Sequence, residues 1–157
     1  MATVSETTLE ANKAIVRRFV QEVLVGGSVA AVDELVADDF VPHTWPSDPN
    51  GKAALKAAIE RVAAGLSDVT MTIDDLVAEG DEVVARLTAS ATQVGPFMGL
   101  QPSGKRYAIG EIHIFRIERG RIVEHWHQAD MLGIMRQLGA LPAPAKAPGG
   151  DAASSKA

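Results

Sequence analysis

The stretch that decides the fold runs from Tyr107 to Asp130 and reads YAIGEIHIFRIERGRIVEHWHQAD. Both of its arms are dense in β-branched and aromatic residues, a composition typical of strands. Between the arms, ERGR supplies polar turn residues, and Gly120 can take the positive φ that a tight loop requires. The stretch therefore predicts a β-hairpin with Arg119-Gly120 as its two-residue loop.

The alternation of side chains along a strand predicts which residues of this hairpin share a face. An undistorted register places a polar and aromatic set on one face: Glu111, His113, Trp126, Gln128 and Asp130. The other face carries Arg116, His125 and His127. Because an unpaired buried polar group costs about 1–3 kcal/mol, the first set indicates a hydrogen-bonded network or a ligand pocket, or else a half-solvated surface.

The composition limits the class of protein. The chain has 157 residues, of which 46% are hydrophobic, and this suits one globular domain with a full core. The net charge of −5 and the lack of a basic run argue against a nucleic-acid partner. Cysteine is absent, which excludes disulfides, thiolate metal ligands and a cysteine nucleophile. With no leader sequence or long apolar run, we expect a cytoplasmic protein without a membrane segment.

Helical patterns come first along the chain, and strand patterns follow. The predicted helices run from a cap at Thr7 or Thr8 to Gly26-Gly27, from Ser28 to Ala37, and from Gly51 or Lys52 to Leu66. Strands are predicted over 69–78 and 83–94, and a short helix over 131–138 follows the hairpin. This order predicts an α+β protein with a largely antiparallel sheet that packs one face on the helices.

Two loops carry side chains that could line a pocket. Phe40–Pro46 contains two prolines and is predicted to be irregular, and its His43 and Trp45 could equally be surface residues or line a pocket mouth. Gly95–Gly104 is too rich in glycine and proline to form an element, yet its Phe97 and Met98 should fold over an apolar surface. We expect one domain over 1–141 and a disordered tail over 142–157, which is Pro, Ala, Gly and Ser-rich.

Several segments together resemble the SnoaL-like polyketide cyclases. They are GPFMGLQPSG at 95–104, FRI at 115–117, GRIVEHW at 120–126, Asp130, and QLG at 137–139. The resemblance implies the cone-shaped α+β fold of the superfamily that includes nuclear transport factor 2 and ketosteroid isomerase. In such a cone a curved antiparallel sheet packs on three N-terminal helices, and one short C-terminal helix follows. We also expect a homodimer that forms through the exterior of the sheet.

The resemblance further implies an intramolecular aldol closure of an apolar or polycyclic small-molecule substrate, without cofactor or metal. Carried over to this chain, the single acid/base carboxylate is Asp130, assisted by His113. The remaining residues are expected to bind the substrate: His43, Trp45, Phe97, Met98, Glu111, Trp126 and Gln128.

Other interpretations stay open. Asp130 directly precedes the last predicted helix and could equally be its N-cap. His125 and His127 invite a metal site, because His-x-His on a strand projects both rings to one side. We expect none, since no third ligand stands nearby in the sequence and Arg116 shares their predicted face. One alternative function is a non-catalytic binder of an apolar small molecule. The other is a limonene-epoxide-hydrolase-like enzyme, which needs two carboxylates and an arginine around one water; Asp130 and Glu111 are available, but Arg116 is predicted on the other face.

Overall fold

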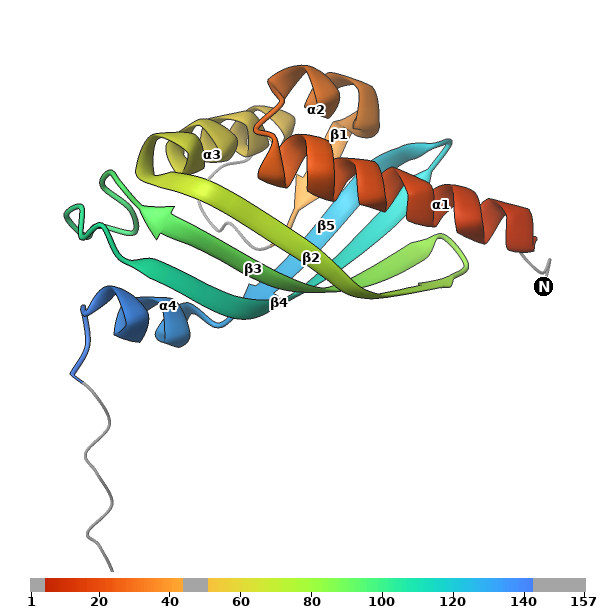
Figure 1. Cartoon of the computed structure of the whole chain (residues 1–157). Helices are drawn as coiled ribbons and strands as arrows, with labels where there is room; N and C mark the ends of the chain where they lie inside the picture. Colours follow the sequence, from red (N-terminus) through yellow and green to blue (C-terminus); the bar gives the residue numbers. More distant parts are fainter. Residues whose placement is uncertain (1–4, 44–50, 143–157) are drawn as a thin grey trace, which may run out of the picture.

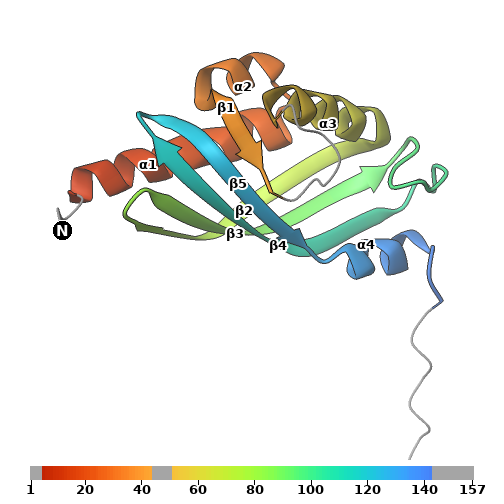
Figure 2. The same ribbon diagram turned by 180° about the vertical axis from the view of Figure 1, so that it is seen from behind.

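Helices cover one face of a curved five-stranded sheet, which confirms the predicted α+β class (Figure 1). The computed structural model describes residues 5–43 and 51–142. In chain order the elements are α1 (Glu6–Arg18), the π-helix η1 (Phe19–Val25), α2 (Val29–Leu35), β1 (Val36–Pro42), α3 (Gly51–Gly65), β2 (Leu66–Glu79), β3 (Glu82–Gln93), β4 (Arg106–Glu118), β5 (Arg121–Ala129) and α4 (Met131–Leu138). The view from behind shows α1, α2 and α3 grouped together, while α4 lies apart from them, after the end of β5 and beside the start of β4 (Figure 2).

The sheet has the order β1-β5-β4-β3-β2, with antiparallel pairing from β5 to β2. The edge strand β1 pairs parallel with β5, and the sequence did not predict it. Because Val36 already pairs with Ile122, the second helix ends at Leu35 and not at the predicted Ala37. Pro42 is the last residue of this edge strand, where a missing N–H does not interrupt a ladder. Pro42 therefore ends the strand rather than forbids it.

The helix ends follow ordinary capping chemistry. The cap of α1 is Ser5 and not Thr7 or Thr8, because the Thr8 N–H donates to Ser5 Oγ at 3.2 Å. Ser28 caps α2 as predicted and accepts from the Ala31 N–H at 3.1 Å. The Gly51–Gly65 and Met131–Leu138 helices also match the predicted spans closely. Within 5–43 and 51–142, no helix is both long and apolar enough to cross a membrane.

The main core lies between the helices and the inner face of the sheet. It joins residues of η1, α2, α3 and the central strands, among them Phe19, Leu35, Leu55, Leu87, Phe115 and Ile122. A smaller cluster under α4 contains Tyr107, Ile109, Ile134 and Leu138. Each large apolar side chain that is fully buried contributes about 1.5–3 kcal/mol to folding, so these clusters fix how the sheet meets the helices.

The central hairpin has the predicted tip but a different register. Glu118 pairs with Arg121 across a loop in which Arg119 and Gly120 have φ values of 50° and 74°. Ile117 then pairs with Ile122 and Arg116 with Glu124, so Val123 is an extra residue in a β-bulge. One extra residue turns every later side chain of β5 to the opposite face.

The predicted faces of β5 are therefore wrong. His113 pairs with His127, and Ile114 with Trp126. His125 and His127 share the inner face of the sheet with His113, whereas Trp126 and Gln128 point to the outer face together with Arg116.

The 95–104 loop is fastened to the sheet by a buried amide. Gln93 is fully buried; its Nε2 donates to the Gln101 carbonyl at 3.1 Å, and its Oε1 accepts from Ser103 Oγ at 2.6 Å. Gly95 lies so close to the end of α3 that a Cβ there would be 2.2 Å from the Ala64 carbonyl oxygen. The loop is thereby held where Phe97 stacks on Tyr107, with ring centroids 6.4 Å apart.

Candidate active site

A large, mostly apolar pocket opens on the inner face of the sheet. Its volume is about 960 Å³, which is enough for a drug-sized molecule. The walls come from the end of η1, α3, the start of β2, the 96–99 segment and the start of α4, and the central strands form the floor. Helix α4 is fixed to β4 by Gln137, whose Nε2 donates to the Ala108 carbonyl at 3.0 Å and whose Oε1 accepts from the Ala108 N–H at 2.9 Å.

Four polar side chains of β4 and β5 meet at the pocket floor. Glu111 and His113 are two residues apart on β4, and His127 is the cross-strand partner of His113, so the pleat points all three to one face. His113 Nε2 lies 2.9 Å from Glu111 Oε2, and His127 Nε2 lies 3.6 Å from the same oxygen. His125 Nε2 lies 2.9 Å from His113 Nδ1 and extends the cluster into the core.

His125 is held rigidly by aromatic neighbours. Its ring lies parallel to that of Phe115, with centroids 4.6 Å apart, and meets the edge of Phe19 at 6.0 Å. The His125 side chain is 2% exposed. Since both phenylalanines belong to the main core, the position of His125 is set by core packing.

The charges of the cluster follow from burial and hydrogen bonding. Burial would raise the pKa of the Glu111 carboxyl, but hydrogen bonds from His113 and His127 outweigh it and lower that pKa to about 2. Burial lowers the pKa of His113, because the attraction of Glu111 offsets it only in part, and burial lowers the pKa of His125 well below its usual value. At neutral pH, Glu111 is therefore ionised and the His113 and His125 imidazoles are neutral.

These charge states give the hydrogen bonds a direction. A carboxylate can only accept, so the His113 Nε2–H donates to Glu111. His113 Nδ1 then carries a lone pair and accepts the Nε2–H of His125. A chain of donors thus runs from the core, through His125 and His113, to the carboxylate at the pocket floor.

The pocket includes four of the residues predicted for the site, namely Phe97, Met98, Glu111 and His113. Trp126 and Gln128 do not line it, because the bulge turns them to the outer face. His43 is also on that outer side rather than at the pocket mouth: its ring stacks on Trp126 with centroids 4.4 Å apart. The predicted Trp45 lies outside the described residues.

Asp130 occupies the alternative position that the sequence allowed, the N-cap of α4. Its Oδ1 accepts the Gly133 N–H at 2.7 Å, and the residue is exposed. Its neighbours Ala129 and Met131 line the pocket, whereas Asp130 does not.

Sequence reasoning missed His125 and His127 as site residues. A signal was present, since Glu-x-His on β4 and His-x-His on the neighbouring β5 each project two ligating side chains to a single face. The structure bears on both reasons for expecting no metal. Glu111 and His113, and not His125, are the ligating groups within reach of His127, and Arg116 lies on the opposite face of the sheet, where it pairs with Glu124.

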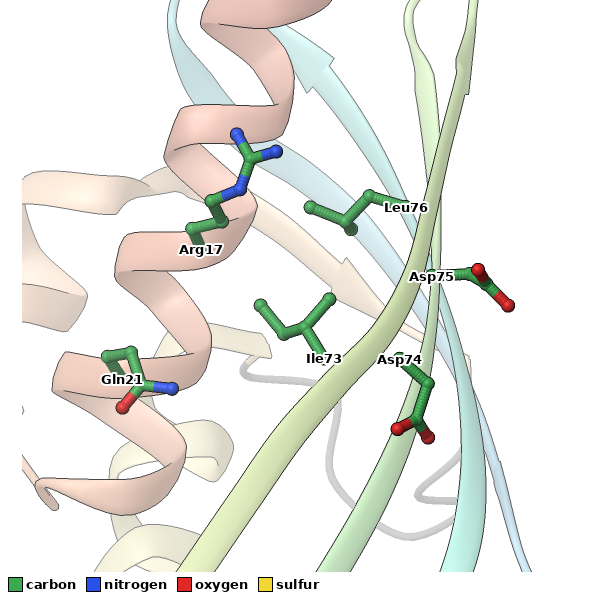
Figure 3. A pocket seen from close by; sticks show the side chains of 6 residues that line it. All are labelled: Arg17, Gln21, Ile73, Asp74, Asp75 and Leu76. Atoms are coloured by element: carbon green, nitrogen blue, oxygen red, sulfur yellow. The ribbon is translucent and has the colours of Figure 1, made fainter.

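A second hollow, between α1 and β2, has a weaker claim to function. Figure 3 shows Arg17 of α1 and Gln21 of η1 facing Ile73 of β2, while Asp74 and Asp75 point away from the helix. Both carboxylates bind Arg86 on the far side, Asp75 at 2.6 Å. The acids of this hollow are thus already engaged elsewhere, and the functional case rests on the larger pocket.

Together, the curved sheet and the polar cluster on its inner face form a candidate site in an α+β cone. A family model described as SnoaL-like polyketide cyclase matches residues 14–138. The chain belongs to this family, and the resemblance seen in the sequence is confirmed.

Its relatives include named cyclases. Aklanonic acid methyl ester cyclase DauD from Streptomyces sp. (strain C5) is 28% identical over 129 residues, covering 80% of each chain. Nogalonic acid methyl ester cyclase from Streptomyces nogalater is 29% identical over 116 residues, covering 72% of this chain and 87% of the relative. The structure of TsrD from Streptomyces laurentii has a TM-score of 0.79 and 36% identity, covering 88% of this chain and 99% of that chain.

Proposed function

We propose that this protein catalyses the intramolecular aldol ring closure of an apolar polyketide ester, by acid–base chemistry at the pocket floor. The observation that carries the proposal is the convergence of Glu111, His113 and His127 on an otherwise apolar pocket of about 960 Å³. The names of the relatives, which are methyl ester cyclases for aklanonic and nogalonic acid, support the substrate class.

The reaction needs a base for one acidic carbon and an acid for one oxygen. In the proposal, the His127 imidazole takes a proton from a carbon that lies between carbonyl groups. The carbanion forms a bond to the carbon of a ketone in the same molecule, and the ketone oxygen takes the proton back from His127. No atom is lost and no oxidation occurs, so product and substrate are isomers. Positioned acid–base groups of this kind contribute about 10²–10⁴-fold to the rate.

Glu111 supports this step electrostatically. The carboxylate lies 3.6 Å from His127 Nε2 and therefore stabilises the imidazolium that forms when His127 is protonated. The N–H of His113 holds the carboxylate in place from the other side, at 2.9 Å. Apolar walls strengthen these interactions, because a site with little water screens charge weakly.

The competing assignment, with Asp130 as the acid/base, stays a prediction. The geometry favours His127, because Asp130 is exposed and its carboxylate already caps α4. The set predicted for an epoxide hydrolase is not assembled at the pocket, since Arg116 lies on the outer face and Asp130 does not line the cavity. A non-catalytic binder would use the same pocket and would differ in showing no turnover.

A ring-closure assay on a polyketide methyl ester tests the proposal. Substrate and product have equal mass, so they are separated by chromatography and identified by NMR. His127→Gln should lower turnover by about 10²-fold or more, and Glu111→Gln should also lower it. Glu118→Gln is the matched control, because Glu118 is an exposed carboxylate at the tip of the same strand.

Asp130→Asn decides between the two assignments, because it keeps a capping oxygen and removes only the base. Wild-type turnover in folded His127→Gln, with turnover lost in Asp130→Asn, would transfer the acid/base role to Asp130. Tight binding of the ester by the wild-type protein without any turnover would make the protein a binder.

A further inference from the structure

We propose that Glu111, His113 and His127 form a binding site for one divalent transition-metal ion, and that Zn²⁺ suits it best. The site goes beyond the proposed ring closure and does not depend on it.

The backbone sets up the convergence of the three ligands. Two of them are at positions i and i+2 of β4, and the third is the direct cross-strand neighbour on β5. Their ligating atoms all lie within 4.8 Å of one another, and the separations of His113 Nε2 and His127 Nε2 from Glu111 Oε2 are 2.9 and 3.6 Å. Tetrahedral Zn²⁺ with bonds of about 2.0–2.1 Å places its ligand atoms roughly 3.3 Å apart. The two separations from Glu111 Oε2 lie on either side of that spacing.

The donor set matches a zinc site that has an open position. Two imidazoles and one carboxylate are the protein ligands of several catalytic zinc sites, in which water or substrate completes the coordination. Here the remaining position faces the pocket, because all three ligands belong to its floor. Arg116, the cation expected to oppose a metal, is on the other face of the sheet in an ion pair with Glu124.

The partner of His113 also suits metal binding. A ligating histidine usually donates its other ring N–H to a nearby acceptor, which fixes the ring. His113 Nδ1 is 2.9 Å from His125 Nε2, and His125 is clamped between Phe115 and Phe19. When His113 Nε2 binds the metal, its Nδ1–H donates to His125, so the same pair of atoms stays hydrogen-bonded with the donor reversed.

Metal and proton compete for the same atoms. A nitrogen of His127 that binds Zn²⁺ cannot accept a proton from the substrate, so Zn²⁺ should inhibit ring closure by the proton route. This consequence is secondary, because binding is measured in the absence of substrate. A failure of metal binding leaves the proposed function intact, and an enzyme without ring-closure activity leaves metal binding intact.

The test uses the full chain, stripped with a chelator and desalted. Isothermal titration with Zn²⁺ should give one saturable site, and titration with Co²⁺ should give the strong visible bands of a low-symmetry, histidine-ligated ion. His127→Gln and Glu111→Gln should each weaken Zn²⁺ binding by about 100-fold or more, since loss of even an outer partner typically costs 10–100-fold. His43→Gln is the matched histidine control and should bind as the wild type does, because His43 lies on the outer face.

A second measurement on the wild-type protein does not require the variants to fold. Zn²⁺ should shift the imidazole ¹⁵N resonances of His113 and His127 and leave those of His43 in place. The inference is overturned if the wild-type protein shows no saturable one-to-one binding. Affinity that survives in folded His127→Gln, or that falls in His43→Gln, would overturn it as well.

Discussion

Replacing Glu111 by Gln should remove a contribution to folding stability that exists only above acidic pH. The pKa of Glu111 is about 2 in the folded protein, against an ordinary value of 4.5. A carboxyl whose pKa is lower in the folded protein than in the unfolded protein stabilises the folded state at pH values above the unfolded pKa. This stability is lost as the pH falls from about 4.5 to 2. One pKa unit corresponds to about 1.4 kcal/mol, so the contribution of Glu111 at neutral pH is about 3 kcal/mol.

The assay is urea unfolding of the wild-type protein and Glu111→Gln at about pH 7, 5 and 3, with chelator present to exclude metal binding. The difference in unfolding free energy should be largest at neutral pH and should shrink towards pH 3. His113 and His125 make both proteins less stable in acid, because their lowered pKa values oppose protonation in the fold. The difference between the two proteins therefore reports the ionisation of Glu111 together with its attraction for His113.

The exposed Glu118→Gln again serves as the control and should change the unfolding free energy by no more than about 0.5 kcal/mol at any pH. A Glu111→Gln variant as stable as the wild type at neutral pH would refute the reasoning. So would a difference that stays constant down to pH 3, because that result would mean that the histidines do not hold the carboxylate ionised.

Three further predictions concern the fold and assembly. Gly95→Ala should lower the melting temperature by several degrees in calorimetry, because its Cβ would lie 2.2 Å from the Ala64 carbonyl oxygen; an unchanged melting temperature would show that the 95–104 loop does not pack tightly on α3. Truncation before Pro142 should change stability by about 0.5 kcal/mol at most, and a larger loss in thermal melting would mean that residues 142–157 dock on the domain. The homodimer stays a prediction, with its expected interface on the outer sheet face, where Ile112 is 41% exposed; a monomer by light scattering at micromolar concentration would contradict it.

Much of the fold could be predicted because its signals are local. Several ends of elements are marked directly in the sequence, by the helix cap Ser28 and by the turn glycines Gly120 and Gly139. The strand β1 could not be predicted in the same way, because its pairing with β5 joins residues about eighty positions apart. The candidate site shows the same division between features that local sequence predicts and features that depend on residues far apart in the chain. The sequence predicted a shared face for Glu111 and His113, and both line the pocket, but which residues of β5 face them depends on packing across the core.

The bulge at Val123 has a physical cause that lies in the core and not in the turn. Without it, Phe115, which is fully buried, would have Glu124 as its cross-strand neighbour on the inner face. A charge buried there without a partner costs several kcal/mol. The extra residue moves Glu124 to the outer face, where it pairs with Arg116, and brings His125 to stack on Phe115 at 4.6 Å. The same displacement sets His127 beside Glu111, so the need to keep one carboxylate out of the core is what assembles the cluster at the pocket floor.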